Sequence, residues 1–211
     1  MINLLSRKLI LVVSLFLILV TSACKSTVFT KKERQIIKQD SAQIMRIYTV
    51  DNSDDISILR AQSTELSNEE ISSDYYKLLS RRMIKTVSDS TVDGVGLAAP
   101  QIGINRRIIT VQRFDKSGTP FEVLPNIYIK EYSKDTTFRT EGCLSVPNKK
   151  GRAVRSKWVI ISYTDPQTLS LQEDTIKGFT SIIFQHEIDH LDGILYTDSI
   201  RSGSNRNAFS R

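Results

Sequence analysis

The stretch Gln185-His186-Glu187-Ile188-Asp189-His190 contains both histidines of the 211-residue chain, four residues apart. On an α-helix this spacing places the two imidazoles on one face, one turn above the other. Two imidazoles arranged in this way can hold one divalent metal, and an acidic residue directly after the first is the usual general base of metal-assisted hydrolysis. The alternative is an exposed amphipathic helix on which two histidines fall by chance.

Apolar residues at helical spacing surround this motif and predict a largely buried helix. They are Phe179, Ile182, Ile183 and Leu191, with Gly193 at the end. Two polar rings at a buried position need a partner, which favours a metal site over a chance arrangement. Asp189 is either a hydrogen-bond partner of the neighbouring His190 or a solvated side chain.

A catalytic metal site usually takes three protein ligands, and the chain has no third histidine. The stretch Glu141-Gly142-Cys143-Leu144-Ser145-Val146-Pro147 contains one of only two cysteines, the other being Cys24. Cys143 is therefore the candidate third ligand. A buried, inert thiol is the alternative interpretation of this residue.

The stretch Gly94-Val95-Gly96-Leu97-Ala98-Ala99-Pro100-Gln101-Ile102-Gly103 contains two glycines that flank one apolar residue. A dinucleotide-binding loop must follow a strand and open a helix, and here a helical pattern precedes the glycines. Glycines at this spacing instead favour the close approach of backbone or substrate. Gln101 is a polar side chain in a small, apolar segment, so it is either a site residue or a surface glutamine.

The body of the chain combines a helical pattern with strand-like runs. A capping box at Ser67 and Glu70 and apolar residues at every fourth position predict one helix over residues 68–87. Four runs rich in β-branched and aromatic residues then predict strands. They are Arg107–Val111, Phe121–Ile129, Ala153–Tyr163 and Leu169–Ile176.

The N-terminus predicts export. Arg7 and Lys8 precede an apolar run from Leu9 to Val20, typical of a signal-peptide core. Thr21-Ser22-Ala23-Cys24 resembles the site at which bacterial signal peptidase cuts before a lipid-bearing cysteine. The predicted organisation is a signal peptide (1–23), lipidated Cys24 with a polar tether or short helix (24–42), a catalytic domain (43–200) and a polar tail (201–211). An uncleaved anchor, or a conventional signal with an incidental Cys24, is the alternative.

The composition is that of a globular protein with a core, with 40% hydrophobic and 25% charged residues. The formal net charge is +6, and the basic residues are scattered without an aromatic-interleaved patch. A dispersed excess of this size indicates a solvated surface, so we expect no nucleic-acid partner.

Taken in order, Gly94–Gln101, Glu141–Ser145 and Gln185–His190 resemble the three signature motifs of the peptide deformylase family. The resemblance extends from Ile44 to Asp198. It implies an α+β fold in which antiparallel sheets wrap around a buried C-terminal helix that carries the metal motif. It also implies a metal-dependent hydrolase that removes the formyl group from N-formylmethionyl peptides and releases formate.

In this resemblance Cys143, His186 and His190 hold one divalent metal, with water in the fourth position. Ferrous iron is the expected ion, and zinc or nickel are alternatives. Glu187 would act first as general base and then as general acid. The expected partner is the peptide substrate, and the chain is expected to be a monomer.

The resemblance assigns the oxyanion donors and the peptide contacts as well. The side-chain amide of Gln101 and the backbone N–H of Leu144 would stabilise the tetrahedral intermediate. The residues expected to contact the peptide are Val95, Gly96, Phe179 and Ile182.

The export signal departs from the family, whose ordinary members are cytoplasmic and act on nascent chains. We therefore expect action in the bacterial cell envelope, with the domain anchored to a membrane through Cys24. The alternative function is a non-catalytic envelope lipoprotein that binds metal or formylated peptides. A peptidase with the same histidine motif would need a Glu or His ligand downstream, and no His remains there.

Overall fold

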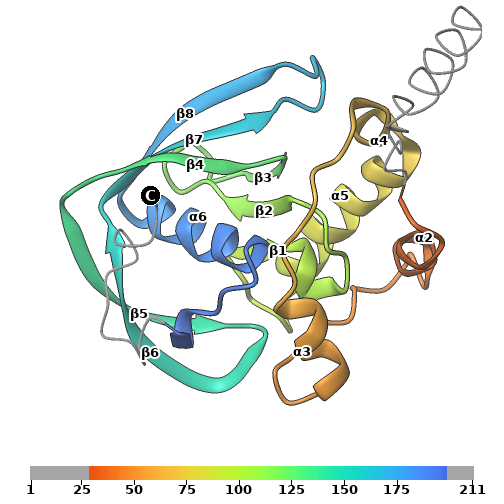
Figure 1. Cartoon of the computed structure of the whole chain (residues 1–211), viewed down its shortest axis with the longest axis horizontal. Helices are drawn as coiled ribbons and strands as arrows, with labels where there is room; N and C mark the ends of the chain where they lie inside the picture. The colour runs from red at the N-terminus through yellow and green to blue at the C-terminus, as the bar shows by residue number, and fades with distance from the viewer. Residues whose placement is uncertain (1–28, 199–211) are drawn as a thin grey trace, which may run out of the picture.

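Helix α6 (Gly178–Leu191) carries the histidine motif and lies among the sheets of the protein (Figure 1). The structure is a computed structural model that describes residues 29–198. Every residue of α6 is buried except Gly178 and Phe179 at its start and His186. A helix that is covered on nearly all sides must lie in the interior, so the predicted buried helix is confirmed.

The strands of residues 29–198 form three antiparallel sheets around α6 (Figure 1). The sheets consist of β1 (Gly96–Ala98), β2 (Ile108–Gln112) and β3 (Phe121–Pro125); of β4 (Tyr128–Tyr132), β7 (Trp158–Thr164) and β8 (Leu171–Lys177); and of the hairpin β5 (Thr136–Cys143) and β6 (Val146–Ser156). An apolar core fills the space between α6 and the first two sheets. The predicted α+β fold with a buried C-terminal helix is confirmed.

Two of the predicted strand runs are each divided in two. The run Phe121–Ile129 is interrupted at Asn126, which adopts a positive φ of 54° that asparagine tolerates better than most residues. The run Ala153–Tyr163 is interrupted at Lys157, whose N–H and carbonyl bond to Asp135 and Gly178 outside the ladder. The sequence patterns predicted neither β1 nor β5.

The single helix predicted over residues 68–87 is wrong. The structure has α4 (Asn68–Ser72) and α5 (Asp74–Val87), separated by Ser73 in extended conformation with ψ 156°. The Ser73 hydroxyl accepts a hydrogen bond from the N–H of Tyr76 and so caps the second helix. The predicted capping box of Ser67 and Glu70 is present at the start of α4.

Of the polar tether or short helix predicted for residues 24–42, the described part from residue 29 contains a short helix that belongs to the folded domain. Helix α2 (Lys31–Lys38) packs on the domain, with Phe29 and Ile37 buried in the same core as α5. Glu33 on α2 forms an ion pair of 2.7 Å with buried Arg106. The folded unit therefore begins before the predicted boundary at residue 43.

Two further short elements lie within residues 29–198, α3 (Ser53–Leu59) and the 3₁₀ helix η1 (Ala99–Ile102). The predicted signal peptide, Cys24 and the polar tail of residues 201–211 lie outside the described residues. Within residues 29–198, no helix has the length and apolar character needed to cross a bilayer.

Candidate metal centre and active site

The structure brings the three predicted metal ligands together. The side-chain donor atoms of Cys143, His186 and His190 all lie within 4.8 Å of one another. The sulfur of Cys143 is 3.1 Å from Nε2 of His190. Adjacent turns of α6 supply the two imidazoles, and the end of β5 supplies the thiol.

An irregularity in the hairpin positions the thiol. The register of β5 and β6 shifts between Gly142 and Cys143, so that Cys143 pairs with Val146 whereas Gly142 pairs with Lys150. Such a bulge redirects a side chain at the end of a ladder. The cysteine thereby reaches the histidine face of α6.

Glu141 fixes the orientation of the first histidine. Its Oε2 lies 2.8 Å from Nδ1 of His186, which leaves Nε2 of His186 for a metal. Arg155 binds the same carboxylate at 2.7 and 2.8 Å. Burial opposes ionisation of Glu141, but the hydrogen bonds from Arg155 and then His186 outweigh it and lower its pKa to about 2.

The protonation states of the other two ligands fit a divalent cation. Burial lowers the pKa of His190 well below its usual value and keeps the imidazole neutral, which is the form that ligates metals. Burial, followed by the charge of Glu187, raises the pKa of the Cys143 thiol to about 12 when no cation is beside it. A bound divalent cation reverses this balance and deprotonates the thiol.

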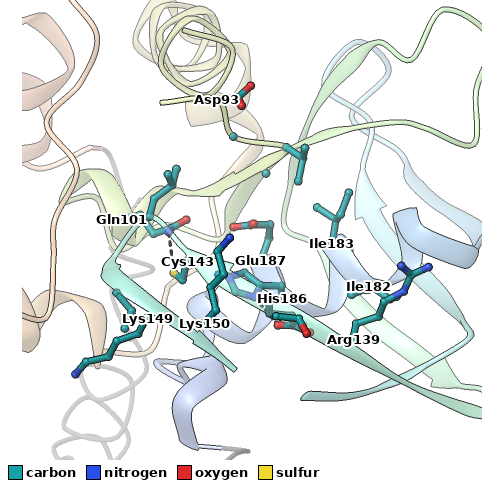
Figure 2. A pocket seen from close by; sticks show the side chains of 18 of the residues that line it. Asp93, Gln101, Arg139, Cys143, Lys149, Lys150, Ile182, Ile183, His186 and Glu187 are labelled. Carbon is teal, nitrogen blue, oxygen red and sulfur yellow. Dashed lines mark hydrogen bonds and ion pairs between the residues drawn. The ribbon is translucent and has the colours of Figure 1, made fainter. Parts of the chain in front are cut away.

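Glu187 lies beside this cluster as the candidate acid–base residue (Figure 2). Its side chain is buried, and among residues 29–198 no group forms a hydrogen bond to its Oε2. Burial, with a smaller contribution from the charge of Glu141, raises the pKa of Glu187 to about 8. A carboxyl group with a pKa near neutrality and an open oxygen suits a general base that must later act as an acid.

Gln101 is buried at the site and is not a surface glutamine (Figure 2). Its Oε1 accepts a hydrogen bond of 2.8 Å from the N–H of Ala98. Its Nε2 lies 3.2 Å from Oγ of Ser145 and 3.6 Å from the sulfur of Cys143. The fixed Oε1 therefore holds the amide donor toward the metal cluster.

A cavity of about 770 Å³ opens above the cluster. Its lining includes Val95, Gly96, Leu144, Phe179 and Ile182, so all the predicted peptide contacts are brought together here. Strand β1 lies at the edge of its sheet next to the cavity. An open strand edge can pair with an extended peptide.

Gly96 is required by the close approach of β1 to α6. A Cβ at this position would lie 2.4 Å from Oε1 of Glu187, which is too close for any real contact. The spacing of the two glycines predicted that another group approaches the backbone closely here. In the structure that group is the side chain of Glu187, the candidate general base.

The sequence patterns indicated no roles for Glu141, Arg155 and Ser145. Glu141 stands two residues before Cys143 in the quoted motif, and this i, i+2 spacing on a strand was a usable signal. Arg155 gave no local signal, because it pairs with Thr137 in the ladder and its side chain reaches Glu141 only in the folded hairpin. Asp189, considered as a partner of His190, forms an ion pair with Arg155.

Comparison with known proteins agrees with this geometry. The family described as polypeptide deformylase matches residues 44–206. The chain belongs to the peptide deformylase family. The enzyme class predicted from the motifs, a peptide deformylase, is confirmed.

Individual relatives cover most of the domain. A peptide deformylase of Leptospira biflexa is 36% identical over 152 residues, which are 69% of this chain and 83% of the relative. A crystal structure of a class I type b peptide deformylase from Acinetobacter baumannii superposes with a TM-score of 0.67 at 31% identity, covering 74% of this chain and 99% of that one. The same enzyme with Met-Ala-Ser bound gives a TM-score of 0.65 at 31% identity, covering 74% and 98%.

Proposed function

We propose that this enzyme hydrolyses the formyl amide of N-formylmethionyl peptides at the cluster of Cys143, His186 and His190, and that it acts in the cell envelope. The single observation that carries the chemistry is Glu187, a buried carboxyl with one oxygen unpartnered among residues 29–198, directly beside three convergent metal-ligating atoms. Membership of the peptide deformylase family supports the choice of a formyl amide as the substrate bond.

Cys143, His186 and His190 would hold one divalent ion. A thiolate with two imidazoles suits borderline metals, so we propose ferrous iron, with zinc and nickel as ions that the same donors accept. When bound, the ion supplies Lewis-acid activation of water and of the formyl carbonyl.

Glu187 moves the proton in this proposal. Its carboxylate accepts a proton from the attacking water as the oxygen bonds to the formyl carbon. It then donates that proton to the leaving nitrogen as the carbon–nitrogen bond breaks, which yields formate and a free amine. Burial raises the pKa of Glu187 to about 8 in the metal-free protein, and the charge of a bound cation would lower it from that value toward the neutral range in which one group performs both transfers.

Gln101 and Leu144 would stabilise the negative charge that grows on the former carbonyl oxygen. The Nε2 group of Gln101 is preorganised by the hydrogen bond between its Oε1 and Ala98, so it need not reorient during the reaction. The backbone N–H of Leu144 follows the cysteine ligand directly and would be the second donor.

The peptide would lie along β1 in the cavity. Val95 and Gly96 would pair with its backbone, and Phe179 and Ile182 would contact the methionine side chain. All four residues line the same cavity. The solved relative with Met-Ala-Ser bound supports a peptide beginning with methionine as the ligand of this fold.

The envelope location is proposed from the leader and Cys24. An enzyme anchored there would act on formylated peptides outside the cytoplasm. The test is fractionation of native cells together with a Cys24→Ala variant. We expect the wild-type protein with the membranes and the variant released from them. An unprocessed, cytosolic wild-type protein would contradict this location and leave the chemistry unaffected.

Formate release tests the chemistry. The chain is purified without air, loaded separately with ferrous iron, nickel or zinc, and given formyl-Met-Ala-Ser. We expect one metal per chain and catalytic release of formate with at least one ion. One bound metal per chain with no turnover for any ion would contradict the proposal and favour the non-catalytic binding protein.

A further inference from the structure

Helix α2 presents a row of basic side chains on its outer side. Lys31, Arg34 and Lys38 recur at i, i+3 and i+7, so they share one side of the helix, which forms the basic face of α2. Lys31 and Lys38 are exposed, and Arg34 is half-buried. Among residues 29–198, the salt bridge of α2 is that of Glu33 with Arg106, and the three basic residues form none. Their charges are therefore available to a partner.

An open hollow of about 630 Å³ lies along the basic face. Its lining consists of the three basic residues with Gln35, Gln39 and Tyr75, so in the described part of the chain it includes no Asp or Glu. The ammonium group of Lys38 lies over the ring of Tyr75, 5.0 Å from its centre. Cations and amide groups around an open hollow suit a phosphate group at a surface.

The orientation of α2 is fixed by the domain beneath it. Buried Arg82 on α5 donates hydrogen bonds of 3.0 and 2.9 Å to the carbonyl groups of Ile36 and Ile37. The ion pair between Glu33 and Arg106, at 2.7 Å, holds the first turn of the helix. Figure 1 shows α2 at the outer edge of the molecule beside α5. The basic face therefore points outward without any rearrangement.

The chain enters the domain directly before α2. Phe29 is buried in the core around α5, so this entry point is fixed. Cys24 stands five residues earlier, and five residues of extended chain span at most about 18 Å. A lipid on Cys24 would hold the start of α2 within that distance of a bilayer, where the exposed cations can reach the surface.

Contact through α2 leaves the metal cavity open. Within residues 29–198, no residue that lines this cavity belongs to α2 or α5. A surface that covers the basic face therefore need not cover the cavity, and peptides can still enter from water.

We propose that the basic face of α2 docks on the anionic phospholipid surface of the bilayer that holds the lipid on Cys24, with headgroup phosphates in the hollow. The anchored enzyme is thereby held in one orientation with its metal cavity accessible. A lipid chain together with a basic patch is a combination that anchors a protein stably. Each cation near an anionic surface favours contact by about fivefold. This inference rests on the proposed envelope location and is independent of the proposed chemistry.

The experiment measures how fast individual lysines are acylated in the membrane-bound protein. The full chain, expressed with its leader and purified from membranes, is added to preformed vesicles of phosphatidylcholine alone or with about a third of phosphatidylglycerol. Flotation shows that the protein is bound, and peptide mass spectrometry gives the rate at each lysine. We expect Lys31 and Lys38 to react at least about fivefold more slowly on the anionic vesicles, and this protection to shrink at about 0.5 M salt. Lys177, an exposed lysine at the end of β8, is the internal control and should react equally on both.

Variants assign the protection to the basic face. The double variant Arg34→Gln, Lys38→Gln keeps Lys31 as the reporter, and the protection of Lys31 should fall to about the level on neutral vesicles. Lys130→Gln with Lys134→Gln removes the same charge from exposed positions outside α2 and should leave Lys31 protected. Protection of Lys31 that survives in the first double variant would overturn the inference.

The remaining outcomes separate this inference from the location on which it rests. A protein that floats with both kinds of vesicle but shows equal rates at Lys31 and Lys38 is anchored without docking, which overturns the inference alone. Protection that is also present on neutral vesicles and rises with protein concentration would show that a second copy covers α2, and would overturn it too. A chain that floats with neither kind of vesicle would contradict the anchor, and the inference with it, while formate release would still test the chemistry.

Discussion

Oε2 of Glu141 lies 2.8 Å from Nδ1 of His186, and Arg155 donates a hydrogen bond to each oxygen of the same carboxylate. This pair determines which nitrogen of the imidazole faces the metal cluster. Replacing Glu141 by Ala should therefore weaken metal binding about 10- to 100-fold, the range typical of such partners. Competition with a chelator measures the change, and Glu131→Gln, an exposed carboxylate on β4, is the control. Unchanged affinity in Glu141→Ala would contradict the assigned role.

Gly96→Ala should lower kcat at least 100-fold, because the new methyl group overlaps Oε1 of Glu187 at 2.4 Å and must displace the general base. Gly142→Ala is the matched control, since a Cβ there meets Lys150 only at an ordinary 3.8 Å. The rates should be compared at equal metal content. A Gly96→Ala enzyme within a few-fold of the wild type would show that Glu187 has room to move without loss of function.

The metal-free protein should lose stability as the pH rises from about 4.5 to about 8. In this window folded Glu187 keeps a proton that the unfolded chain has released, since burial raises its pKa from 4.5 to about 8. The free energy of unfolding then falls by up to ~1.4 kcal/mol per pH unit. Urea unfolding of the wild type and of Glu187→Gln at pH 5 and pH 8 measures it. The variant should lose less stability over this range, and equal losses would refute the assignment.

Ile37→Ala should destabilise the protein by about 2–4 kcal/mol, because the side chain is fully buried between α2 and the core around α5. Ile37 belongs to the core around α5 and lines neither the metal cluster nor its cavity, so the kcat of the folded variant should stay close to that of the wild type. Urea unfolding measures the change, with Gln35→Ala, an exposed position on the same helix, as control. A loss below 0.5 kcal/mol would mean that α2 is only loosely attached.

Sequence patterns predicted the features that depend on residues close together in the chain. The helix around His186 and His190 follows from its apolar spacing, and the capping box at Ser67 follows from two side chains three residues apart. The break at Ser73 escaped prediction because the apolar period continues across it, and only the backbone conformation of one residue separates the two helices.

The features that the sequence did not predict depend on contacts between residues far apart in the chain. Residues 29–42 are mostly polar in sequence. In the structure, however, Phe29 and Ile37 are buried in the core around α5, and Glu33 forms an ion pair with Arg106. The buried Arg155 forms ion pairs with Glu141 on the neighbouring strand β5 and with Asp189 on α6, and neither partner is close to it in the sequence. The candidate metal ligands and Gln101 were predicted because they belong to contiguous motifs, whereas Arg155, which holds Glu141 in place, does not.

The most direct test of the proposed mechanism is formate release by Glu187→Gln at matched metal content. The account predicts that this variant binds one metal per chain, as the wild type does, and releases formate from formyl-Met-Ala-Ser at least ~10²-fold more slowly, because general acid–base catalysis contributes about 10²–10⁴-fold. A variant that binds one metal and turns over within tenfold of the wild type would contradict the central role of Glu187.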